Sequence, residues 1–139
     1  MDSSAVIALL DESADEHDAV AAAVRSFEGA LVVSPFVVAE LDFMLVRRLG
    51  RRAVEQFNLD VALGSYELAG WTPADHAEAM HVTRAFEGDD YIGVADASNV
   101  VLADRYRTSV MFTLDQRHFR KLQPIWGPDY FTLLPYDSE

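Results

Sequence analysis

The sequence predicts an α/β domain in which a parallel sheet is covered by helices on both faces. Short apolar runs rich in β-branched residues alternate with longer helical patterns, as parallel strands joined by crossover helices do. The 139 residues are the usual length of one domain, and half of them are hydrophobic, enough for a buried core. With no internal repeat and no linker, residues 1–139 are expected to form one domain.

The first elements are two helices and a strand. Helical patterns cover residues 3–10 and 14–27, with Ser13 suited to cap the second helix and Gly29 suited to end it. The run at 30–34 is short, apolar and β-branched, which indicates a buried strand.

The middle of the chain predicts two helices and a second strand. Ser34 can cap a helix that runs to about residue 49. Pro35 suits the first position of this helix, where a missing N–H costs nothing. Gly50 ends this helix, residues 51–63 form the next, and 66–71 can be a strand.

The last elements alternate in the same way. A helix capped by Thr72 ends near Phe86, and a second helix is expected from its apolar spacing. The SVMFTL run is the strongest strand signal in the chain, and a short helix and a final strand follow it. These last four elements are expected at residues 95–106, 109–114, 116–122 and 130–134.

The composition excludes some kinds of chemistry and indicates the cellular compartment. There is no cysteine, which excludes disulfides, thiol catalysis and thiolate zinc sites and fits a reducing compartment. The longest uncharged stretch, residues 29–39, is far too short to span a membrane, and Asp2 at the start argues against a signal peptide. A cytoplasmic protein without membrane association is expected.

The formal net charge of −12 argues against nonspecific nucleic-acid binding, but the basic residues are not scattered. Nine of the 11 fall into two clusters, which are either solvated helix faces or a rim that contacts phosphates. The first cluster is Arg47, Arg48, Arg51 and Arg52, and the second is Arg105, Arg107, Arg117, Arg120 and Lys121.

Four of the 23 acidic residues are embedded in apolar sequence, where an ionised group is costly unless it is compensated. They are Asp2, Glu40, Asp96 and Asp115. On a helix, apolar residues three and four positions away flank Glu40, but the same is true of Asp42, so periodicity does not choose between these two.

Asp115 follows a predicted strand, and ligands of open α/β sheets bind beyond the carboxyl ends of strands. Asp115 and Asp96 could instead cap the helices that begin near them. Taken together, the four acids suggest a site for a hard divalent cation, because converging carboxylates repel one another and oxygen ligands suit Mg²⁺ or Mn²⁺. Such a site fits phosphodiester hydrolysis by metal-activated water.

Four blocks of sequence carry a family resemblance that spans nearly the whole chain. DSSAVIALL, VSPFVVAELDFMLVRRLG, IGVADASNVVLADRYR and VMFTLDQRHF together resemble PIN-domain proteins, particularly VapC-type toxins of bacterial, actinobacterial-like VapBC toxin–antitoxin systems. The resemblance implies a three-layer α/β/α fold with a central, mostly parallel sheet, and a Mg²⁺- or Mn²⁺-dependent endoribonuclease.

The resemblance also assigns roles to individual residues. Asp2 and Asp96 would be the direct metal ligands, while Glu40 and Asp115 would hold metal-bound water, position the nucleophile or bind a second ion. The supporting hydrogen bonds would come from Ser4, Asn99 and Thr113. Asp89 and Asp90 could line the groove, although a solvated loop is the favoured interpretation of these two residues. The RNA backbone would be contacted by Arg47, Arg48, Arg51, Arg52 and Arg117.

The family's partners are expected as well. These toxins form homodimers, cut structured ribosomal or transfer RNA, and are silenced by a cognate VapB-type antitoxin. One departure concerns the start, because only Met1 precedes Asp2 where the family has a short strand. A truncated first strand would leave Asp2 on a frayed terminus and weaken metal binding and cleavage.

This interpretation has several alternatives. A phosphoacceptor receiver domain needs a lysine near the site, and Lys121 is poorly placed for that role. A catalytically idle PIN-fold interaction module and a DNA nuclease on the same fold stay open. The four histidines are interpreted as surface or core-edge residues: His17, His76, His81 and His118. Trp71 and Trp126 could stack on bases, but they are interpreted as core residues.

Overall fold

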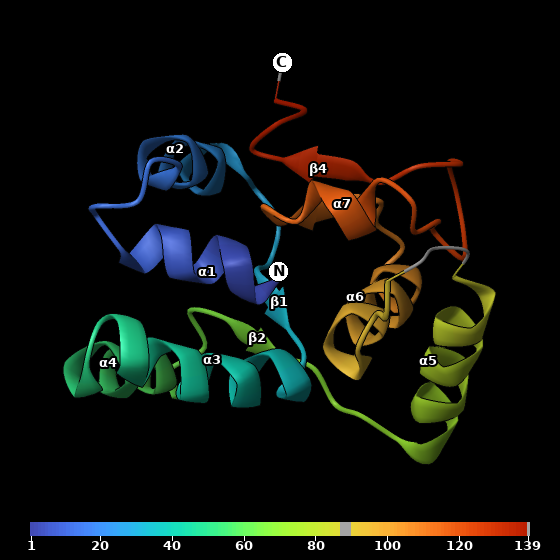
Figure 1. Cartoon of the computed structure of the whole chain (residues 1–139), viewed down its shortest axis with the longest axis horizontal. Coiled ribbons are helices and arrows are strands. Elements are labelled where there is room, and N and C mark those ends of the chain that lie inside the picture. The colour runs from blue at the N-terminus through green and yellow to red at the C-terminus, as the bar shows by residue number, and fades with distance from the viewer. Residues whose placement is uncertain (87–89, 139) are drawn as a thin grey trace.

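The computed structural model describes residues 1–86 and 90–138, and its elements follow the predicted order (Figure 1). They are α1 (Ser3–Leu10), α2 (His17–Ser26), β1 (Val32–Val33), α3 (Pro35–Arg48), α4 (Arg51–Ala62), β2 (Glu67–Leu68), α5 (Pro73–Ala85), α6 (Val94–Arg105), β3 (Val110–Phe112), α7 (Gln116–Phe119) and β4 (Thr132–Leu134). Strands run through the middle of the molecule, with α1 to α4 on one side and α5 and α6 on the other (Figure 1).

Two of the predicted helix caps are confirmed. The Ser34 side chain accepts a hydrogen bond from the backbone N–H of Val37 at 3.1 Å, with Pro35 in the first turn of α3. Thr72 and Asp75 form a reciprocal capping box at the start of α5. Local sequence therefore determines where both helices begin.

The cap predicted at Ser13 is wrong. The backbone N–H and the hydroxyl of Ser13 both donate to Asp11 Oδ1, at 3.0 and 2.6 Å. An Asp side chain that binds the backbone two residues on stabilises a turn instead of a helix. As a result α2 begins at His17, three residues later than predicted.

The strands are parallel, as predicted, but they form two separate pairs instead of one continuous sheet. β1 pairs with β2 and β3 pairs with β4. The backbone of the first two residues lies between the pairs: the Met1 nitrogen donates to Val32 O at 2.7 Å, and the Asp2 N–H donates to Phe112 O at 2.9 Å. A stunted strand thus takes the central position.

The expectation of a frayed Asp2 is therefore wrong. Asp2 is only 4% exposed, because it is bonded to β3 and α1 begins at the next residue. The terminus lies beside β1 at the centre of the fold (Figure 1).

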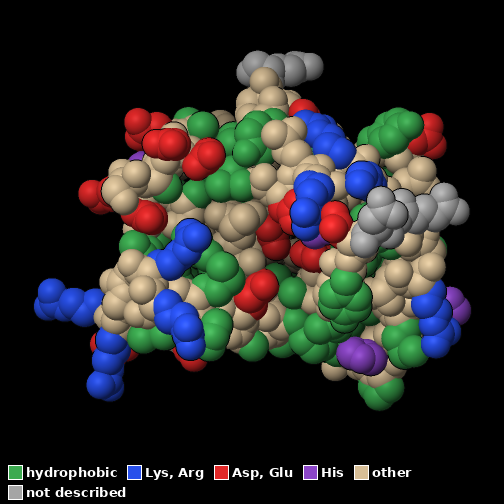
Figure 2. All heavy atoms as spheres, viewed as in Figure 1, with side chains coloured by type: hydrophobic (Ala, Val, Ile, Leu, Met, Phe, Trp, Pro, Cys, Tyr) green, Lys and Arg blue, Asp and Glu red, His purple; other side chains and the backbone are tan. Residues whose placement is uncertain are grey.

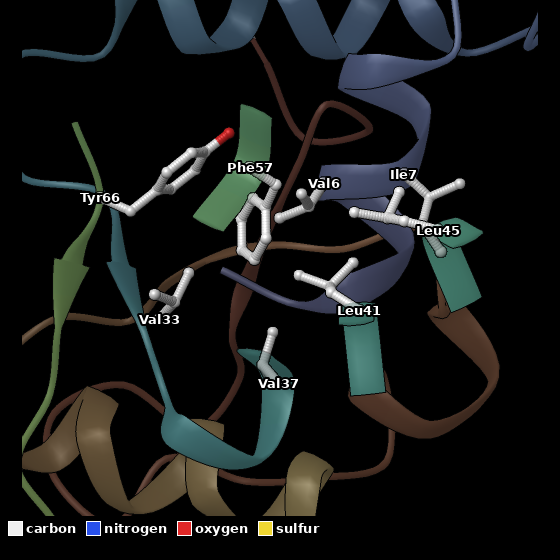
Figure 3. Close-up of a cluster of buried hydrophobic side chains, with 8 residues drawn as sticks. All are labelled: Val6, Ile7, Val33, Val37, Leu41, Leu45, Phe57 and Tyr66. Carbon is white, nitrogen blue, oxygen red and sulfur yellow. The ribbon is translucent and has the colours of Figure 1, made fainter. Parts of the chain in front are cut away.

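The largest core cluster fills the space between α1, α3, α4 and the β1–β2 pair (Figure 3). Its members are Val6, Ile7, Val33, Val37, Leu41, Leu45, Phe57 and Tyr66. Burying each large apolar side chain contributes about 1.5–3 kcal/mol to folding. A second cluster, which includes Val100, Met111 and Phe119, joins α6 to the β3–β4 pair and α7.

Ser34 directly follows β1 and Thr113 directly follows β3, and both residues are fully buried. No helix within the described ranges is long and apolar enough to cross a membrane.

Candidate active site

The Asp2 carboxylate is held by two hydroxyl groups. Its Oδ2 atom accepts hydrogen bonds from Ser4 Oγ at 2.6 Å and from Thr113 Oγ1 at 2.9 Å. The backbone N–H of Leu114 donates to Ser4 Oγ at 2.9 Å, so the end of β3 fixes this arrangement. Ser4 and Thr113 therefore lie where the sequence predicted supporting hydrogen bonds, and they leave Oδ1 of Asp2 for another ligand.

Tertiary structure separates Glu40 from Asp42, which periodicity could not do. Glu40 Oε2 accepts a hydrogen bond from Ser3 Oγ at 2.7 Å, next to Asp2. Asp42 instead accepts a bond from Asn58 Nδ2 of α4 at 3.3 Å. Sequence reasoning missed Ser3, although its position between two site residues, Asp2 and Ser4, was a usable signal.

The helices that carry Glu40 and Asp96 are joined at their first turns. Ser98 Oγ of α6 donates to Ser34 Oγ, the cap of α3, at 2.7 Å, and both residues are fully buried. This contact joins the N-terminal cap of α3, the helix of Glu40, to α6 at a position two residues after Asp96.

Asp96 lies in the first turn of α6, and its pKa shows how the acids are arranged. Burial and the charge of Asp2 raise the pKa of Asp96 to about 6, with smaller contributions in the same direction from Asp115 and Glu40. His118 opposes the shift. The four predicted acids thus face one region, where their mutual repulsion disfavours a fourth negative charge. The helix cap that Asp96 was alternatively expected to form belongs to Gly93.

Asp115 both caps α7 and faces the site. Its Oδ1 accepts a hydrogen bond from the His118 backbone N–H at 3.0 Å, and its own N–H donates to Thr113 Oγ1 at 3.0 Å. Through Thr113, Asp115 is connected to Asp2. The capping and site interpretations of Asp115 are therefore compatible.

His118 lies at the edge of the core, one of the two positions expected for the histidines, and its contact with Asp115 was not predicted. It is 8% exposed, and its Nδ1 lies 2.7 Å from Asp115 Oδ2. The spacing could have indicated this contact, because a residue three positions after a capping Asp faces that cap.

The two tryptophans, both predicted to be core residues, differ in their burial. Trp71 packs against Phe36 with ring centroids 5.1 Å apart, as a core residue does. Trp126 is 49% exposed, so its interpretation as a core residue is wrong. The Arg107 guanidinium lies over the Trp126 ring, with the guanidinium carbon 5.3 Å from the ring centroid.

Other predicted site residues lie at the margin. Asn99 is buried beside a cavity of about 210 Å³ that Met1 and Phe112 also line, and within the described residues its Nδ2 atom has no hydrogen-bond partner. Arg117 forms an ion pair with Asp90 at 3.4 Å. Asp89, also predicted to line the groove, lies outside the described residues.

The donor set fits a hard cation, although residues 1–86 and 90–138 contain no preassembled group of three or more His, Asp or Glu side chains around a metal position. Mg²⁺ typically takes only one or two protein carboxylates and keeps its waters. Oxygen donors dominate here, and a cation would relieve the repulsion that raises the pKa of Asp96.

Acidic and basic side chains lie close together near the site (Figure 2). Acidic side chains gather near the centre of the view, and basic side chains project from the region of α3 and α4 at its lower left. The Arg47 guanidinium carbon lies 4.1 Å from the centroid of the Phe43 ring.

Comparisons with known proteins agree with this geometry. The family model for the PIN domain matches residues 1–123. Ribonuclease VapC26 of Mycobacterium tuberculosis is 44% identical over 135 residues, covering 97% of this chain and 98% of the relative. The crystal structure of M. tuberculosis VapC20, described as a sarcin–ricin loop cleaving toxin, has a TM-score of 0.73 at 17% identity, covering 83% of this chain and 88% of that one. At that identity the structural match shows the shared fold.

Proposed function

This chain belongs to the PIN domain family, and on that premise we propose that it is a metal-dependent endoribonuclease that hydrolyses RNA phosphodiester bonds. The observation that carries the proposal is the meeting of Asp2, Glu40 and Asp115 around Asp96, whose pKa burial and Asp2 raise most. The relative that is 44% identical, named a ribonuclease, supports the reaction.

The proposed cofactor is Mg²⁺, for which Mn²⁺ can substitute, held by Asp2 and Asp96. When bound, such an ion lowers the pKa of a water molecule and neutralises charge on the phosphate. Ser4 and Thr113 orient Asp2 by occupying its Oδ2 atom. Asp96 lies on a helix that Ser98 ties to α3.

The other two acids orient water and substrate in this proposal. Ser3 holds one oxygen of Glu40, which leaves its second oxygen to accept a hydrogen bond from the attacking water. Asp115 is held through both oxygens, each of which retains a lone pair for a water molecule or a sugar hydroxyl.

RNA would be held by its backbone. Arg47, Arg48, Arg51 and Arg52 lie at the junction of α3 and α4, and Arg117 lies beside the site. Guanidinium groups suit phosphate oxygens, and such contacts position RNA without reading its sequence.

We extend the proposal to a biological role as a toxin of a type II toxin–antitoxin system. The relative's designation as a VapC protein supports this role. In this role the substrate is a structured ribosomal or transfer RNA. The toxin forms a homodimer, acts in the cytoplasm and is neutralised by a cognate VapB-type antitoxin.

Cleavage of bacterial total RNA by the purified chain tests the enzymatic proposal. In Mg²⁺ or Mn²⁺ we expect discrete fragments that disappear in chelator and in Asp96→Asn, which removes a ligand charge and keeps the shape. If a folded Asp96→Asn variant cut as fast as the wild type, the assignment of this site would be wrong.

Glu40 and Asp42 provide a matched pair on one helix. Glu40→Gln should slow cleavage by about 10²-fold or more, by analogy with other groups that act in proton transfer. Asp42→Asn, which alters only a contact with α4, should leave the rate within about twofold. Equal losses in the two variants would show a general effect of charge on α3.

A further inference from the structure

The side chain of His118 is buried in the wall of the acidic site, although the acids alone account for metal binding there. It is 8% exposed. Its Nδ1 atom lies 2.7 Å from Asp115 Oδ2. Because a carboxylate only accepts hydrogen bonds, Nδ1 carries the proton and donates it to this bond.

The rest of the imidazole ring is also held. The ring of Phe86 packs against it in a T-shaped contact, with centroids 5.9 Å apart. Arg117 Nη2 approaches His118 Nε2 to 3.5 Å, and the same guanidinium pairs with Asp90. The imidazole of His118 therefore lies between the Phe86 ring and the Arg117 guanidinium, and its Nδ1–H is directed at Asp115.

Asp115 gains a second anchor from this bond. Its Oδ1 atom is already held by the His118 backbone N–H, as in an ordinary helix cap. With one anchored oxygen, the carboxylate can still turn about its terminal torsion, which has only broad preferences. The ring N–H holds Oδ2 and removes that freedom.

Resting on the proposed function, we propose that His118 is a positioning residue that holds the Asp115 carboxylate in the one orientation useful for RNA cleavage. The bond keeps Asp115 at the end of β3, connected through Thr113 to Asp2 but not turned into the region that Asp2 and Asp96 share. His118 itself contacts no reacting atom in this proposal.

A role in packing alone would also bury His118, so the variants must separate packing from the hydrogen bond. His118→Phe keeps an aromatic ring against Phe86 but lacks the donor. His118→Asn loses the ring but places an amide N–H near the position of Nδ1. Retention of secondary structure and of cooperative melting would be verified for both variants.

We expect His118→Phe to lower kcat by about 10- to 100-fold, the usual cost of removing a group that orients a site residue, with KM unchanged. His118→Asn should recover at least part of that loss. In an Asp115→Asn background, measured at high enzyme concentration, His118→Phe should cause little further loss. Full activity in folded His118→Phe, or equal independent losses in both backgrounds, would overturn the inference.

A readout that needs no activity distinguishes this inference from the proposed function. In ¹⁵N-labelled protein, the His118 ring should show a protonated Nδ1 whose resonance moves in Asp115→Ala. Unchanged ring resonances in that variant would overturn the contact itself. If the contact is present but the wild type cuts no RNA with either metal, the proposed function is wrong, and the positioning role of His118 in RNA cleavage is wrong as well.

Discussion

The two arginine clusters look alike in the sequence, but the fold compensates their charges differently. In the second cluster, Arg105 pairs with Asp75, Arg107 with Asp104, Arg117 with Asp90 and Arg120 with Asp137, at N–O distances of 2.6 to 3.4 Å. In the first cluster only Arg51 forms such an ion pair within the described ranges, with Glu55 one helical turn away.

The difference shows which charges are available to a ligand. A paired cation must give up its partner before it can bind phosphate, whereas an unpaired cation releases only counterions. The same contrast holds among the acids. Asp75 and Asp137 are bound by arginines, while Asp96 faces other carboxylates. Arg105, Arg107 and Arg120 are thus compensated by carboxylates, whereas Arg47, Arg48 and Arg52 form no ion pair within the described ranges.

The largest expected effect comes from neutralising the four arginines of the first cluster. Replacing Arg47, Arg48, Arg51 and Arg52 with Gln should weaken RNA binding by about 100-fold or more at low salt. It should also reduce the slope of log affinity against log salt by roughly 0.7 per lost phosphate contact with a single strand. The measurement is a binding titration at several salt concentrations in a catalytically silent background.

The matched control neutralises three paired arginines of the second cluster and leaves Arg117, which is proposed to contact RNA. Replacing Arg105, Arg107 and Arg120 with Gln should lower the melting temperature while changing the salt slope by less than 1, because their carboxylate partners already compensate these charges. An equal change of slope in both sets would remove the distinction between the two clusters.

A smaller effect is expected on the stability of the metal-free protein, through the raised pKa of Asp96. Because its folded pKa, about 6, lies above its ordinary value of 3.8, the folded state holds a proton more tightly than the unfolded state. The destabilisation is therefore complete above pH 6 and disappears as the pH falls toward 4. Asp96→Asn should stabilise the metal-free protein at pH 7.5 by about 1–2 kcal/mol, a value reduced for solvent screening of a partly exposed group.

Denaturant unfolding at pH 7.5 and at pH 4 measures this effect. The gain in Asp96→Asn should be present at the higher pH and nearly absent at the lower one. Adding Mg²⁺ should stabilise the wild type more than the variant, because only the wild type keeps the ligand charge. An equal gain of stability at both pH values, or no gain at either, would show that the fold does not raise the pKa of Asp96.

The smallest expected effect comes from a paired acid. Arg120, together with the Leu133 backbone N–H, holds the pKa of Asp137 below its ordinary value. The stability this provides is present above about pH 4 and is lost as the pH falls below it. Asp137→Asn should destabilise the protein by about 0.5 kcal/mol at pH 7, because the pair is exposed to solvent. Thermal melting should show this loss without a change in RNA binding.

Much of the site could be predicted from the chain because local rules select its parts. The caps at Ser34 and Thr72 predicted where α3 and α5 begin, and both are found. The position of Asp115 after the strongest strand predicted its place beside the other acids. The Ser13 cap failed because Asp11, equally polar and two residues earlier, binds the same backbone.

The choice between Glu40 and Asp42 shows what periodicity lacks. Both have apolar neighbours along the helix, so the pattern is degenerate, and only the packing of α4 against α3 and the contact with Ser3 separate them. For His118 the sequence left a surface and a core-edge position open, and its packing against Phe86, from a distant part of the chain, decides between them.

By itself, the sequence determined the order of helices and parallel strands, the absence of thiol chemistry and the four carboxylates, since each follows from residue type and short-range spacing. Only the tertiary structure decided which carboxylate of α3 faces the site, that residues 1 and 2 join the two strand pairs, and which arginines stay unpaired. These outcomes depend on partners far away in the chain, and electrostatic and hydrogen-bond energies are set by distances that no local pattern contains.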